Sequence, residues 1–378
     1  MHPITDESGM GFPHPKPSLS FWLQGTRNNP LIGHRTTETI PPDADVVVVG
    51  AGMSGAATAY HLFEGYDPAR GDLPKVVVLE AREACYGATG RNGGHCKPDC
   101  YRGAFRELLH SACLSRYCRK GYPKYKRTFG KDQAMKILQN EKVRGLLSLI
   151  GSNSERNLLR LKETLDLLTR IVEEENIDCD LWRGHSFGSQ STGTVSIFAP
   201  LTQFRPPDIA LNQSCADGFL AALQEFGADG GEVDGVIEWI SDPQEAKRRT
   251  RCVYAHAAAV HPTGSFWPYK FVTSLLRLCI DKFSLNLQTN TPVLSVLPSG
   301  DGNWTVETGR GSVKATKVVF ATNAYTSSLL PEFTDKIVPI RGQCSVVVPT
   351  KSYSGERVLT HSYSLRWRMA GEHSQTST

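Results

Sequence analysis

The sequence predicts an α/β fold organised around a parallel β-sheet, and three observations within residues 45–82 support this prediction. Residues 46–49 are four consecutive valines, and residues 76–79 are a second unbroken apolar run. Continuous, β-branched runs of this kind are typical of strands that are covered on both faces. Between them, residues 53–63 have the composition of a helix, and glycines stand where the first strand would turn into it.

The glycines of this turn have the spacing of a dinucleotide-binding motif. Gly50, Gly52 and Gly55 follow the G-x-G-x-x-G pattern. The first lets the chain turn sharply, the second leaves room for a pyrophosphate, and the third lets the helix pack against the strand. The helix would begin at Met53 and Ser54, so that its unpaired amides and the positive end of its dipole face the phosphates.

The second predicted strand ends in Glu80, whose carboxylate could accept hydrogen bonds from ribose hydroxyls. Glu80 lies 25 positions after Gly55, against ~20 in the usual motif, and the polar loop 65–74 accounts for the surplus. A membrane span over residues 46–63 is excluded, because its fully apolar part is far shorter than the ~20 residues that a bilayer requires. The pattern therefore predicts a dinucleotide site.

The composition is that of a globular protein and argues against several other classes. Among 378 residues, 40% are hydrophobic and 21% are charged, with a net charge of +4. This small charge argues against nucleic-acid binding, and the basic, tyrosine-containing segment 116–127 is better explained as a solvated helix end than as an RNA contact. The ten cysteines lack the spacing of metal ligands, so we expect reduced thiols and no metal. With no signal peptide and no membrane span, we expect a cytoplasmic protein.

The chain divides into five segments by composition. Residues 1–44 are rich in proline and predict an extended N-terminal arm, which Phe21, Trp22 and Leu23 would anchor. The other predicted segments are the first part of the dinucleotide domain (45–110), a helical substrate region (111–260) with an irregular insertion at 186–207, the remaining strands of both domains (261–345), and an irregular C-terminal tail (346–378).

Periodicity predicts the elements of the later segments. Leucines at three- and four-residue steps in 158–172, with charged residues between them, indicate an amphipathic helix. A helix is also predicted from Tyr269 onward, after two prolines that stop the preceding chain. Further predictions are a helix at 214–226, a strand at 236–240, and strands at 285–287, 292–297, 304–308 and 313–321 that form a meander around glycine-containing turns.

A glycine-rich loop follows the second predicted strand. Residues 85–99 read CYGATGRNGGHCKPD, and the glycines would allow backbone amides to approach a ligand closely. A flexible linker would have a similar composition. The position directly after Glu80 favours the functional interpretation.

Three stretches together resemble the D-amino-acid and glycine oxidase group of FAD-dependent oxidoreductases. They are VVVVGAGMSGAATAYHL, VVVLEAREACYGATGRNGGH, and VKATKVVFATNAYTSSLLP followed by PIRGQ. The form ATGRNGG, together with WPYK and ATNAYT, is most similar to gamma-glutamylputrescine-oxidase-like members and to a fungal branch of them. The resemblance covers residues 45–341. It implies a Rossmann-type FAD-binding domain, discontinuous in sequence, and a second α+β substrate domain over the flavin.

Carried onto this chain, the resemblance implies a set of cofactor-binding residues. The glycine turn and the start of the helix would hold the pyrophosphate, and the end of the second strand would hold the ribose. The glycine-rich loop would reach the phosphates and the ring system, Val293 would contact the adenine through its backbone, and the last strand would end at the cofactor. The implied residues are Gly50, Gly52, Met53, Ser54, Gly55, Glu80, Ala81, Arg82, Thr89, Gly90, Asn92, Gly93, Gly94, Val293, Ala321 and Thr322.

The chemistry that the resemblance implies is oxidation of a carbon–nitrogen bond in a small amine or amino acid. A hydride passes to the flavin, the imine hydrolyses, and O2 is the expected acceptor, yielding hydrogen peroxide. His95, beside the glycine-rich loop, is a candidate for a group near the flavin, and a structural loop histidine is the alternative. Arg341 in PIRGQ could hold a substrate carboxylate through paired hydrogen bonds, or it could be a structural cation.

Two departures from the family pattern lead to competing expectations. The family has a second glycine-containing flavin segment after PIRGQ, whereas residues 364–378 here are polar and carry no such motif. The insertion at 186–207 has no counterpart in the family. We therefore expect either an FAD-dependent oxidase, a dehydrogenase that uses another acceptor, or a truncated or mis-spliced remnant that binds flavin weakly and is inactive.

Overall fold

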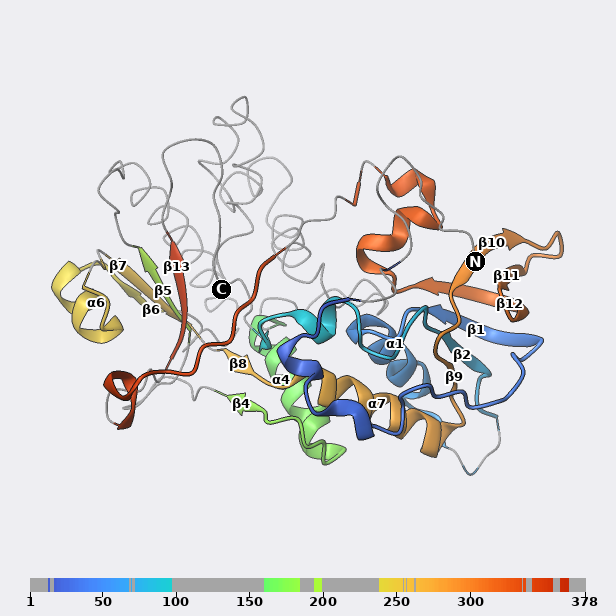
Figure 1. Ribbon diagram of the computed structural model, residues 1–378, viewed down its shortest axis with the longest axis horizontal. Coiled ribbons are helices and arrows are strands. Elements are labelled where there is room, and N and C mark those ends of the chain that lie inside the picture. Colours follow the sequence, from blue (N-terminus) through green and yellow to red (C-terminus); the bar gives the residue numbers. More distant parts are fainter. Residues whose placement is uncertain are drawn as a thin grey trace, which may run out of the picture. The chain divides into compact units, whose positions relative to one another are not determined.

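A computed structural model gives the fold of this protein as two compact units (Figure 1). The first unit comprises Met1–Gly94, Asn176–Cys179 and Trp267–Val346, and the second comprises His95–Glu175, Asp180–Phe266 and Val347–Thr378. The residues that the structure describes are 13, 17–67, 69, 72–96, 160–183, 194–198, 238–253, 255, 257–261, 263–334, 336–337, 342–355 and 361–366.

The first unit is built on a six-stranded sheet with the order β10-β11-β12-β1-β2-β9. Strands β12, β1, β2 and β9 run parallel, and β10, β11 and β12 form an antiparallel meander. The α/β class and its parallel sheet are therefore as the sequence predicts. The strands are β1 (Asp43–Val49), β2 (Val76–Leu79), β9 (Asn286–Gln288), β10 (Val293–Pro298), β11 (Trp304–Thr308) and β12 (Gly311–Phe320).

The valine run fills the centre of this sheet because it has a neighbour on each side. Val49 pairs with Leu79 of β2 and with Phe320 of β12. All four valines of β1 are buried, as is the whole of β2. The core beneath the meander also contains Val293, Val306 and Val313. Burial on this scale stabilises the sheet, since a fully buried valine contributes ~1.5–3 kcal/mol.

Two helices of the first unit pack against each other. Helix α1 spans Met53–Phe63, the range that the sequence predicts, and α7 spans Pro268–Phe283. The rings of Phe63 and Phe283 stack with centroids 5.0 Å apart and planes only 6° from parallel. The predicted strands 76–79 and 304–308 also have the observed bounds, and β10 and β12 differ from prediction by one or two residues at their ends. The strand predicted at 285–287 is β9, shifted by one residue, and its predicted place in the meander was wrong because it pairs in parallel with β2 at the other edge of the sheet.

The N-terminal arm is less extended than the sequence predicts. It contains two short 3₁₀ turns, Phe21–Leu23 and Thr26–Asn28. Leu23 is 4% exposed and Leu31 only 2% exposed, so the arm contributes side chains to the core of the first unit. In the described residues of the arm, these two turns correct the prediction of an extended segment, because proline content reports backbone restriction and not tertiary packing.

The second unit contains two small sheets and two described helices. One sheet has the order β13-β5-β7-β6, and the other has the order β3-β8-β4. Helix α4 spans Arg160–Glu174 and confirms the predicted amphipathic helix. The other elements are α6 (Pro243–Thr250), β3 (His95–Cys96), β4 (Trp182–Arg183), β5 (Thr194–Phe198), β6 (Glu238–Ile240), β7 (Ala257–His261), β8 (Gly264–Ser265) and β13 (Ser362–Arg366).

Two of these strands correct the sequence prediction. Strand β5 lies within 186–207, and β13 lies within 346–378, where no regular structure was predicted. They pair with each other in parallel, and β5 also pairs with β7 in antiparallel register. A partner so distant along the chain leaves no local signal, because strand formation depends on cross-strand neighbours. The predicted helix at 214–226 lies outside the described residues.

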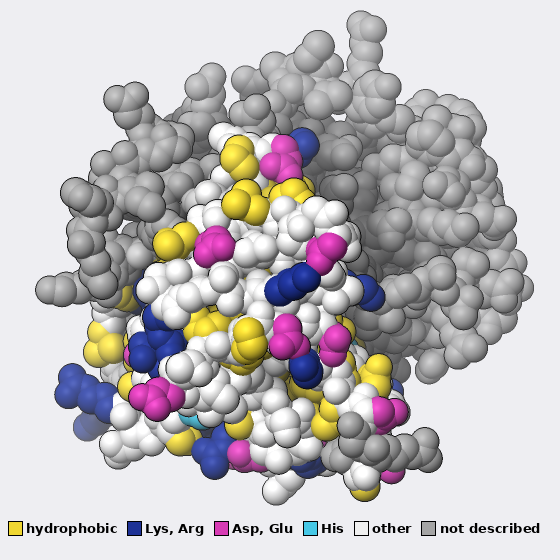
Figure 2. Space-filling view, turned by 90° about the vertical axis from the view of Figure 1, so that its right-hand side faces the viewer, with side chains coloured by type: hydrophobic (Ala, Val, Ile, Leu, Met, Phe, Trp, Pro, Cys, Tyr) yellow, Lys and Arg dark blue, Asp and Glu magenta, His cyan; other side chains and the backbone are white. Residues whose placement is uncertain are grey.

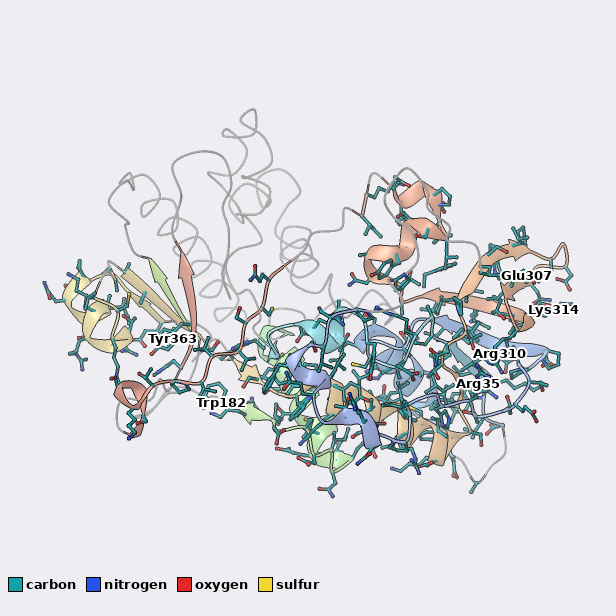
Figure 3. All side chains as sticks on the ribbon, in the orientation of Figure 1. Arg35, Trp182, Glu307, Arg310, Lys314 and Tyr363 are labelled. Atoms are coloured by element: carbon teal, nitrogen blue, oxygen red, sulfur yellow. The ribbon has the colours of Figure 1, made fainter. Side chains whose placement is uncertain are left out.

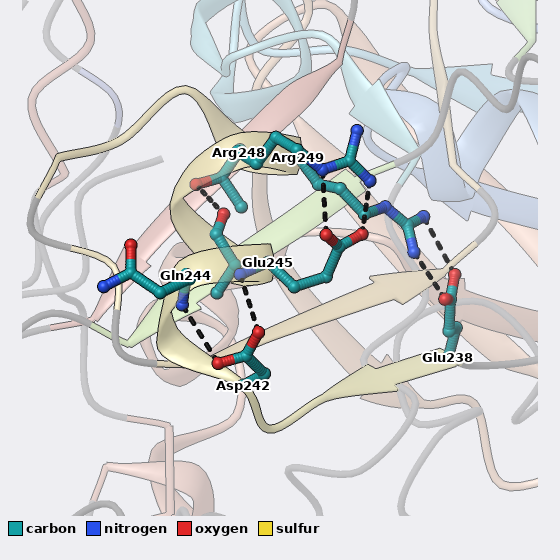
Figure 4. Close-up of polar contacts among 8 residues, drawn as sticks. Glu238, Asp242, Gln244, Glu245, Arg248 and Arg249 are labelled. Atoms are coloured by element: carbon teal, nitrogen blue, oxygen red, sulfur yellow. Dashed lines mark hydrogen bonds and ion pairs between the residues drawn. The ribbon is translucent and has the colours of Figure 1, made fainter.

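Helix α6 shows how a polar segment becomes helical through its ends (Figure 4). The Asp242 carboxylate accepts hydrogen bonds from the amides of Gln244 and Glu245, which satisfies donors that a helix start leaves unpaired. Arg249 then forms two hydrogen bonds to Glu238, at 2.5 and 2.9 Å, and so joins the helix to β6. The second unit therefore fixes this helix by capping and an ion pair rather than by a broad apolar face.

The surface of the molecule mixes apolar and charged side chains. On the face in Figure 2, apolar groups lie between lysines, arginines and acidic residues. Leu297 of β10 and Trp304 of β11 lie on these two paired strands and are 55% and 40% exposed. No helix in the described part of the chain has the length and apolar character needed to cross a membrane.

Candidate functional site

The glycine turn after β1 brings two strand ends and a helix start together. Gly50 has a φ of +106°, and a Cβ there would lie 2.6 Å from the carbonyl oxygen of Ala321. A Cβ on Gly55 would lie 1.8 Å from the carbonyl oxygen of Gly50. Both positions therefore require glycine for steric reasons. The close approach places the N-terminus of α1 directly over the end of β1.

Polar groups surround the start of α1. Gly52 is the residue that precedes the helix, and it offers no side chain to cap the helix amides. The amide of Met53 donates to Oγ1 of Thr89 at 3.0 Å, and the amide of Ala51 donates to the Glu80 carboxylate at 2.8 Å. Backbone amides and the positive end of a helix dipole attract anions. Glu80 and Thr89 thus border a turn that can accept a phosphate group.

Glu80 occupies the end of β2 and is held by backbone groups. Its carboxylate accepts from the amides of Ala51 and Arg82, the latter at 3.0 Å. Burial is the main influence and raises the pKa of Glu80, while these amides and the charge of Arg82 act in the opposite direction. Its backbone carbonyl accepts from Thr291 at 2.8 Å, which ties the strand end to the segment before β10.

The glycine-rich loop forms a 3₁₀ turn over Ala88–Arg91 that follows β2. Gly90 and Gly94 are buried, whereas Asn92 and Gly93 are exposed. Gly94 has a φ of +71°, and its amide donates to the Asn92 side-chain oxygen at 2.8 Å. A Cβ on Gly90 would lie 2.2 Å from the Cys85 carbonyl oxygen, so this position also tolerates only glycine. The loop is therefore compact and not a loose linker.

The remaining predicted cofactor residues lie at the ends of other strands. Ala321 follows β12 and donates its amide to the carbonyl of Val49 at 2.9 Å. Thr322 shares a 2.8 Å hydrogen bond with Thr326 in the next turn. Val293 begins β10 and is 4% exposed within the core cluster that contains Val49.

The structure brings most of the predicted residues to one region of the first unit. The ends of β1, β2 and β12, the start of α1 and the glycine-rich loop meet there. The residues in this group are Gly50, Gly52, Met53, Ser54, Gly55, Glu80, Ala81, Arg82, Thr89, Gly90, Asn92, Gly93, Gly94, Ala321 and Thr322.

The structure does not test the roles of the two predicted catalytic residues. His95 begins β3, is exposed, and pairs through its backbone with Ser265 of β8. Arg341 lies outside the described residues. Their proposed roles near the flavin and the substrate stay predictions.

A supporting network around Arg310 was missed by the sequence analysis (Figure 3). Its guanidinium donates to the Gln288 side chain at 2.7 Å, to Oγ1 of Thr291 at 2.9 Å, and to the backbone carbonyl of Glu38 at 2.7 Å. Desolvation, followed by the charge of the nearby Arg35, lowers the pKa of Arg310. The network fixes the segment between β9 and β10. No sequence signal revealed this network, because Arg310 lies between two glycines, and such a pattern predicts only a turn.

The residues of this region fit a flavin dinucleotide by their chemistry. A pyrophosphate requires amide donors and a backbone without a Cβ, and the turn at Gly52 supplies both. Ribose hydroxyls require an acceptor at the end of the neighbouring strand, and the Glu80 carboxylate lies there. Ala81 and Arg82 follow it directly.

A family model and several known proteins match this chain. The DAO family model, described as FAD dependent oxidoreductase, matches residues 45–373. A probable oxidoreductase OrdL of Haemophilus influenzae is 23% identical over 328 residues, which cover 85% of this chain and 59% of the relative. Among solved structures, L-amino acid deaminase from Proteus myxofaciens is 17% identical with a TM-score of 0.47, covering 79% of this chain and 50% of that one. L-proline dehydrogenase from P. horikoshii is 17% identical with a TM-score of 0.49, covering 90% and 68%.

The chain thus spans 59% of the first of these relatives and 50% of the second. The family match extends over both units, from the first valine strand to beyond β13. By this match and by the glycine turn with its neighbouring carboxylate, the chain belongs to the DAO family of FAD dependent oxidoreductases, and its cofactor is FAD.

Proposed function

We propose that this protein oxidises the carbon–nitrogen bond of a small amine or amino acid, with O2 as the final acceptor. The observation that carries the proposal is the compact loop of Ala88–Arg91 and the glycines after it, set against the start of α1. Its ATGRNGG sequence resembles that of the amine- and amino-acid-oxidising members of the family. The resemblance to gamma-glutamylputrescine-oxidase-like proteins, including a fungal branch, supports an amine or amino-acid substrate.

In this proposal, the residues of the first unit bind and orient the cofactor. The amides at the start of α1 hold the pyrophosphate, and the Glu80 carboxylate accepts from ribose hydroxyls. Thr89 and the following glycine loop lie along the phosphates and the ring system. Val293 contacts the adenine through its backbone, and Ala321 and Thr322 end their strand at the cofactor.

FAD held by these residues would supply the oxidising power for removing a hydride from the carbon that bears the amine. The substrate must present a neutral amine, so a proton has to leave its nitrogen before or during this step. His95, which follows the glycine loop directly, is our candidate for a group that takes part near the ring. Arg341 is our candidate for binding a substrate carboxylate. The resulting imine hydrolyses to a carbonyl compound and a free amine, while O2 takes up two electrons and two protons to give hydrogen peroxide.

A visible spectrum combined with a peroxide assay tests this function. The purified protein should be yellow, and an amine, a D-amino acid or an N-methyl amino acid should bleach the flavin band under anaerobic conditions. Readmitting air should restore the band and release hydrogen peroxide in a one-to-one ratio with the imine product. A protein that stays colourless in excess FAD would reject the proposal.

The same assay separates an oxidase from a dehydrogenase. If the bleached flavin is reoxidised by an artificial electron acceptor but not by air, O2 is not the acceptor and the second half of the proposal is wrong. A cytoplasmic location also remains a prediction from the sequence, which fractionation of cells that express the protein would test.

A further inference from the structure

The N-terminal arm contacts the glycine-rich loop over several consecutive residues (Figure 1, blue and cyan). Oγ of Ser20 donates to the carbonyl oxygen of Gly90, and Nε1 of Trp22 donates to the carbonyl oxygen of Asn92. In the opposite direction, the guanidinium of Arg91 donates to the carbonyl oxygen of Ser18 at 2.5 Å. Three successive loop residues are thus bound to one short stretch of the arm, residues 18–23, which we call the strap.

The strap is itself anchored in the first unit. Its Leu23 is 4% exposed and lies against Gly90, where a Cβ would come within 3.3 Å of a Leu23 methyl carbon. The carbonyl oxygen of Trp22 accepts from Nε1 of Trp267 at 2.9 Å. The ring of Phe21 stacks on Trp267 with centroids 6.0 Å apart and planes 24° from parallel. The strap therefore bridges the residue that precedes α7 and the glycine-rich loop.

These hydrogen bonds determine which way the loop amides point. In a trans peptide, the carbonyl and the following amide point in opposite directions. Because the carbonyls of Gly90 and Asn92 face the strap, the amides of Arg91 and Gly93 are directed away from it. On the other side, Oγ1 of Thr89 accepts from Met53 at the start of α1. The strap and α1 thus hold the loop from two sides.

We propose that the strap is a positioning element for FAD, which orients the amides of the glycine-rich loop so that they can bind the cofactor. This inference rests on the proposed function of the loop as part of the FAD site. A loop that lost the strap would keep its glycines but would have to be ordered when FAD binds, and that ordering reduces affinity. The strap is therefore part of the cofactor site although no residue of the G-x-G-x-x-G motif lies in it.

The test compares FAD binding in a double variant, Ser20→Ala with Trp22→Phe, and in the wild type. The substitutions remove the two donors but keep an aromatic ring and a small side chain, so the packing of Leu23 and Trp267 is retained. The matched control, Ser312→Ala with Trp304→Phe, makes the same changes at exposed positions of β12 and β11. Fluorescence titration of the apoprotein with FAD gives the dissociation constant for each protein.

We expect the dissociation constant of the double variant to rise roughly tenfold, which corresponds to ~1.4 kcal/mol, while the control keeps the wild-type value. The melting temperature of the apoprotein should stay close to that of the wild type. At saturating FAD, the visible circular dichroism of the bound flavin should change, because the loop amides are reoriented. Ser20→Thr keeps the hydroxyl and should keep the wild-type affinity.

Each other outcome overturns the inference in a distinguishable way. If the wild type binds FAD and the double variant binds it equally well, the strap has no positioning role, and the proposed function is unaffected. If the affinity and the melting temperature of the apoprotein fall together, the strap only stabilises the fold. If the wild type binds no FAD at all, the proposed function fails and the inference fails with it.

Discussion

Replacing Gly55 or Gly52 by alanine should separate the structural part of the glycine turn from its cofactor-binding part. A Cβ on Gly55 would lie 1.8 Å from the Gly50 carbonyl oxygen, whereas Cβ atoms practically never lie within 3.0 Å of a neighbouring atom. The helix and the strand would have to separate by more than an ångström. At Gly52, the nearest atom to a new Cβ is Oγ1 of Thr89, at 3.2 Å, and that side chain can shift by a few tenths of an ångström.

We expect Gly55→Ala to reduce mainly the stability of the apoprotein and Gly52→Ala to reduce mainly its affinity for FAD. Alanine inside a helix gains ~1 kcal/mol over glycine, but overpacking costs ~1–3 kcal/mol and more when the clash is with backbone. For Gly55→Ala the clash wins, and we expect a net loss of ~2 kcal/mol, which lowers the melting temperature of a unit this size by ~4–8 °C. For Gly52→Ala the apoprotein should lose less than ~1 kcal/mol, yet its affinity for FAD should fall at least ~10-fold, because the methyl group occupies the place of the pyrophosphate.

Thermal denaturation of the apoproteins and FAD titration measure both effects. Gly309→Ala is the control, because Gly309 has no atom within 4 Å of a new Cβ and lies in the β11–β12 turn. A Gly55→Ala apoprotein as stable as the wild type would refute the close approach of α1 to β1. A Gly52→Ala variant that binds FAD normally would refute the assignment of the pyrophosphate to this turn.

Three further predictions concern single side chains. Burial raises the pKa of Glu80, so the Glu80 carboxyl group holds a proton more tightly in the folded apoprotein than in the unfolded chain. The folded state should therefore lose stability as the pH rises above ~4.3, the pKa of an ordinary glutamate. Glu80→Gln should reduce this loss when melting temperatures are measured over a series of pH values. Burial also raises the pKa of the Cys96 thiol to about 11, so at pH 8 iodoacetamide should label Cys96 far more slowly than the exposed Cys344 in a peptide map. Asp242→Ala should cost ~1 kcal/mol of unfolding free energy in urea, because two helix amides lose their acceptor.

Each of these has a contradicting outcome. Equal slopes of stability against pH in the wild type and Glu80→Gln would contradict the raised pKa, and equal labelling rates would contradict the burial of the thiol. For the cap, Ser241→Ala is the control at the preceding exposed position, and equal denaturation midpoints for the two variants would contradict the capping role of Asp242.

The parts of the fold that the sequence predicted are those in which the signal is local. The runs 46–49 and 76–79 are buried on both faces, so their apolar character alone identifies them as strands. The turn between strand and helix requires glycine at Gly50 and Gly55 for steric reasons, and this requirement appears in the sequence as fixed spacing. The α1 helix and three of the four strands predicted for the meander followed from the same reasoning, whereas the fourth is β9, which pairs with β2.

The parts that were missed depend on partners far along the chain. Strand β5 acquires its structure from β7 and β13, and neither is near it in sequence. Phe21, Trp22 and Leu23 were predicted to anchor the arm, but the strap's hydrogen bonds to the backbone carbonyls of residues 90 and 92 have no motif that could reveal them. Helix α6 is a different case, since Asp242 followed by proline is a known start signal that the composition of the polar segment concealed.

The pairing of Val49 with Phe320 has a consequence for how this polypeptide is made. A ribosome releases the first valine strand long before it has synthesised the neighbour that covers one of its edges. Until then the nascent chain carries an apolar, half-paired strand, which is the kind of surface that chaperones bind. Ala321 lies beside Gly50 in the finished sheet and is synthesised long after it, so we expect FAD to bind only late in biosynthesis, to chains in which this sheet is complete.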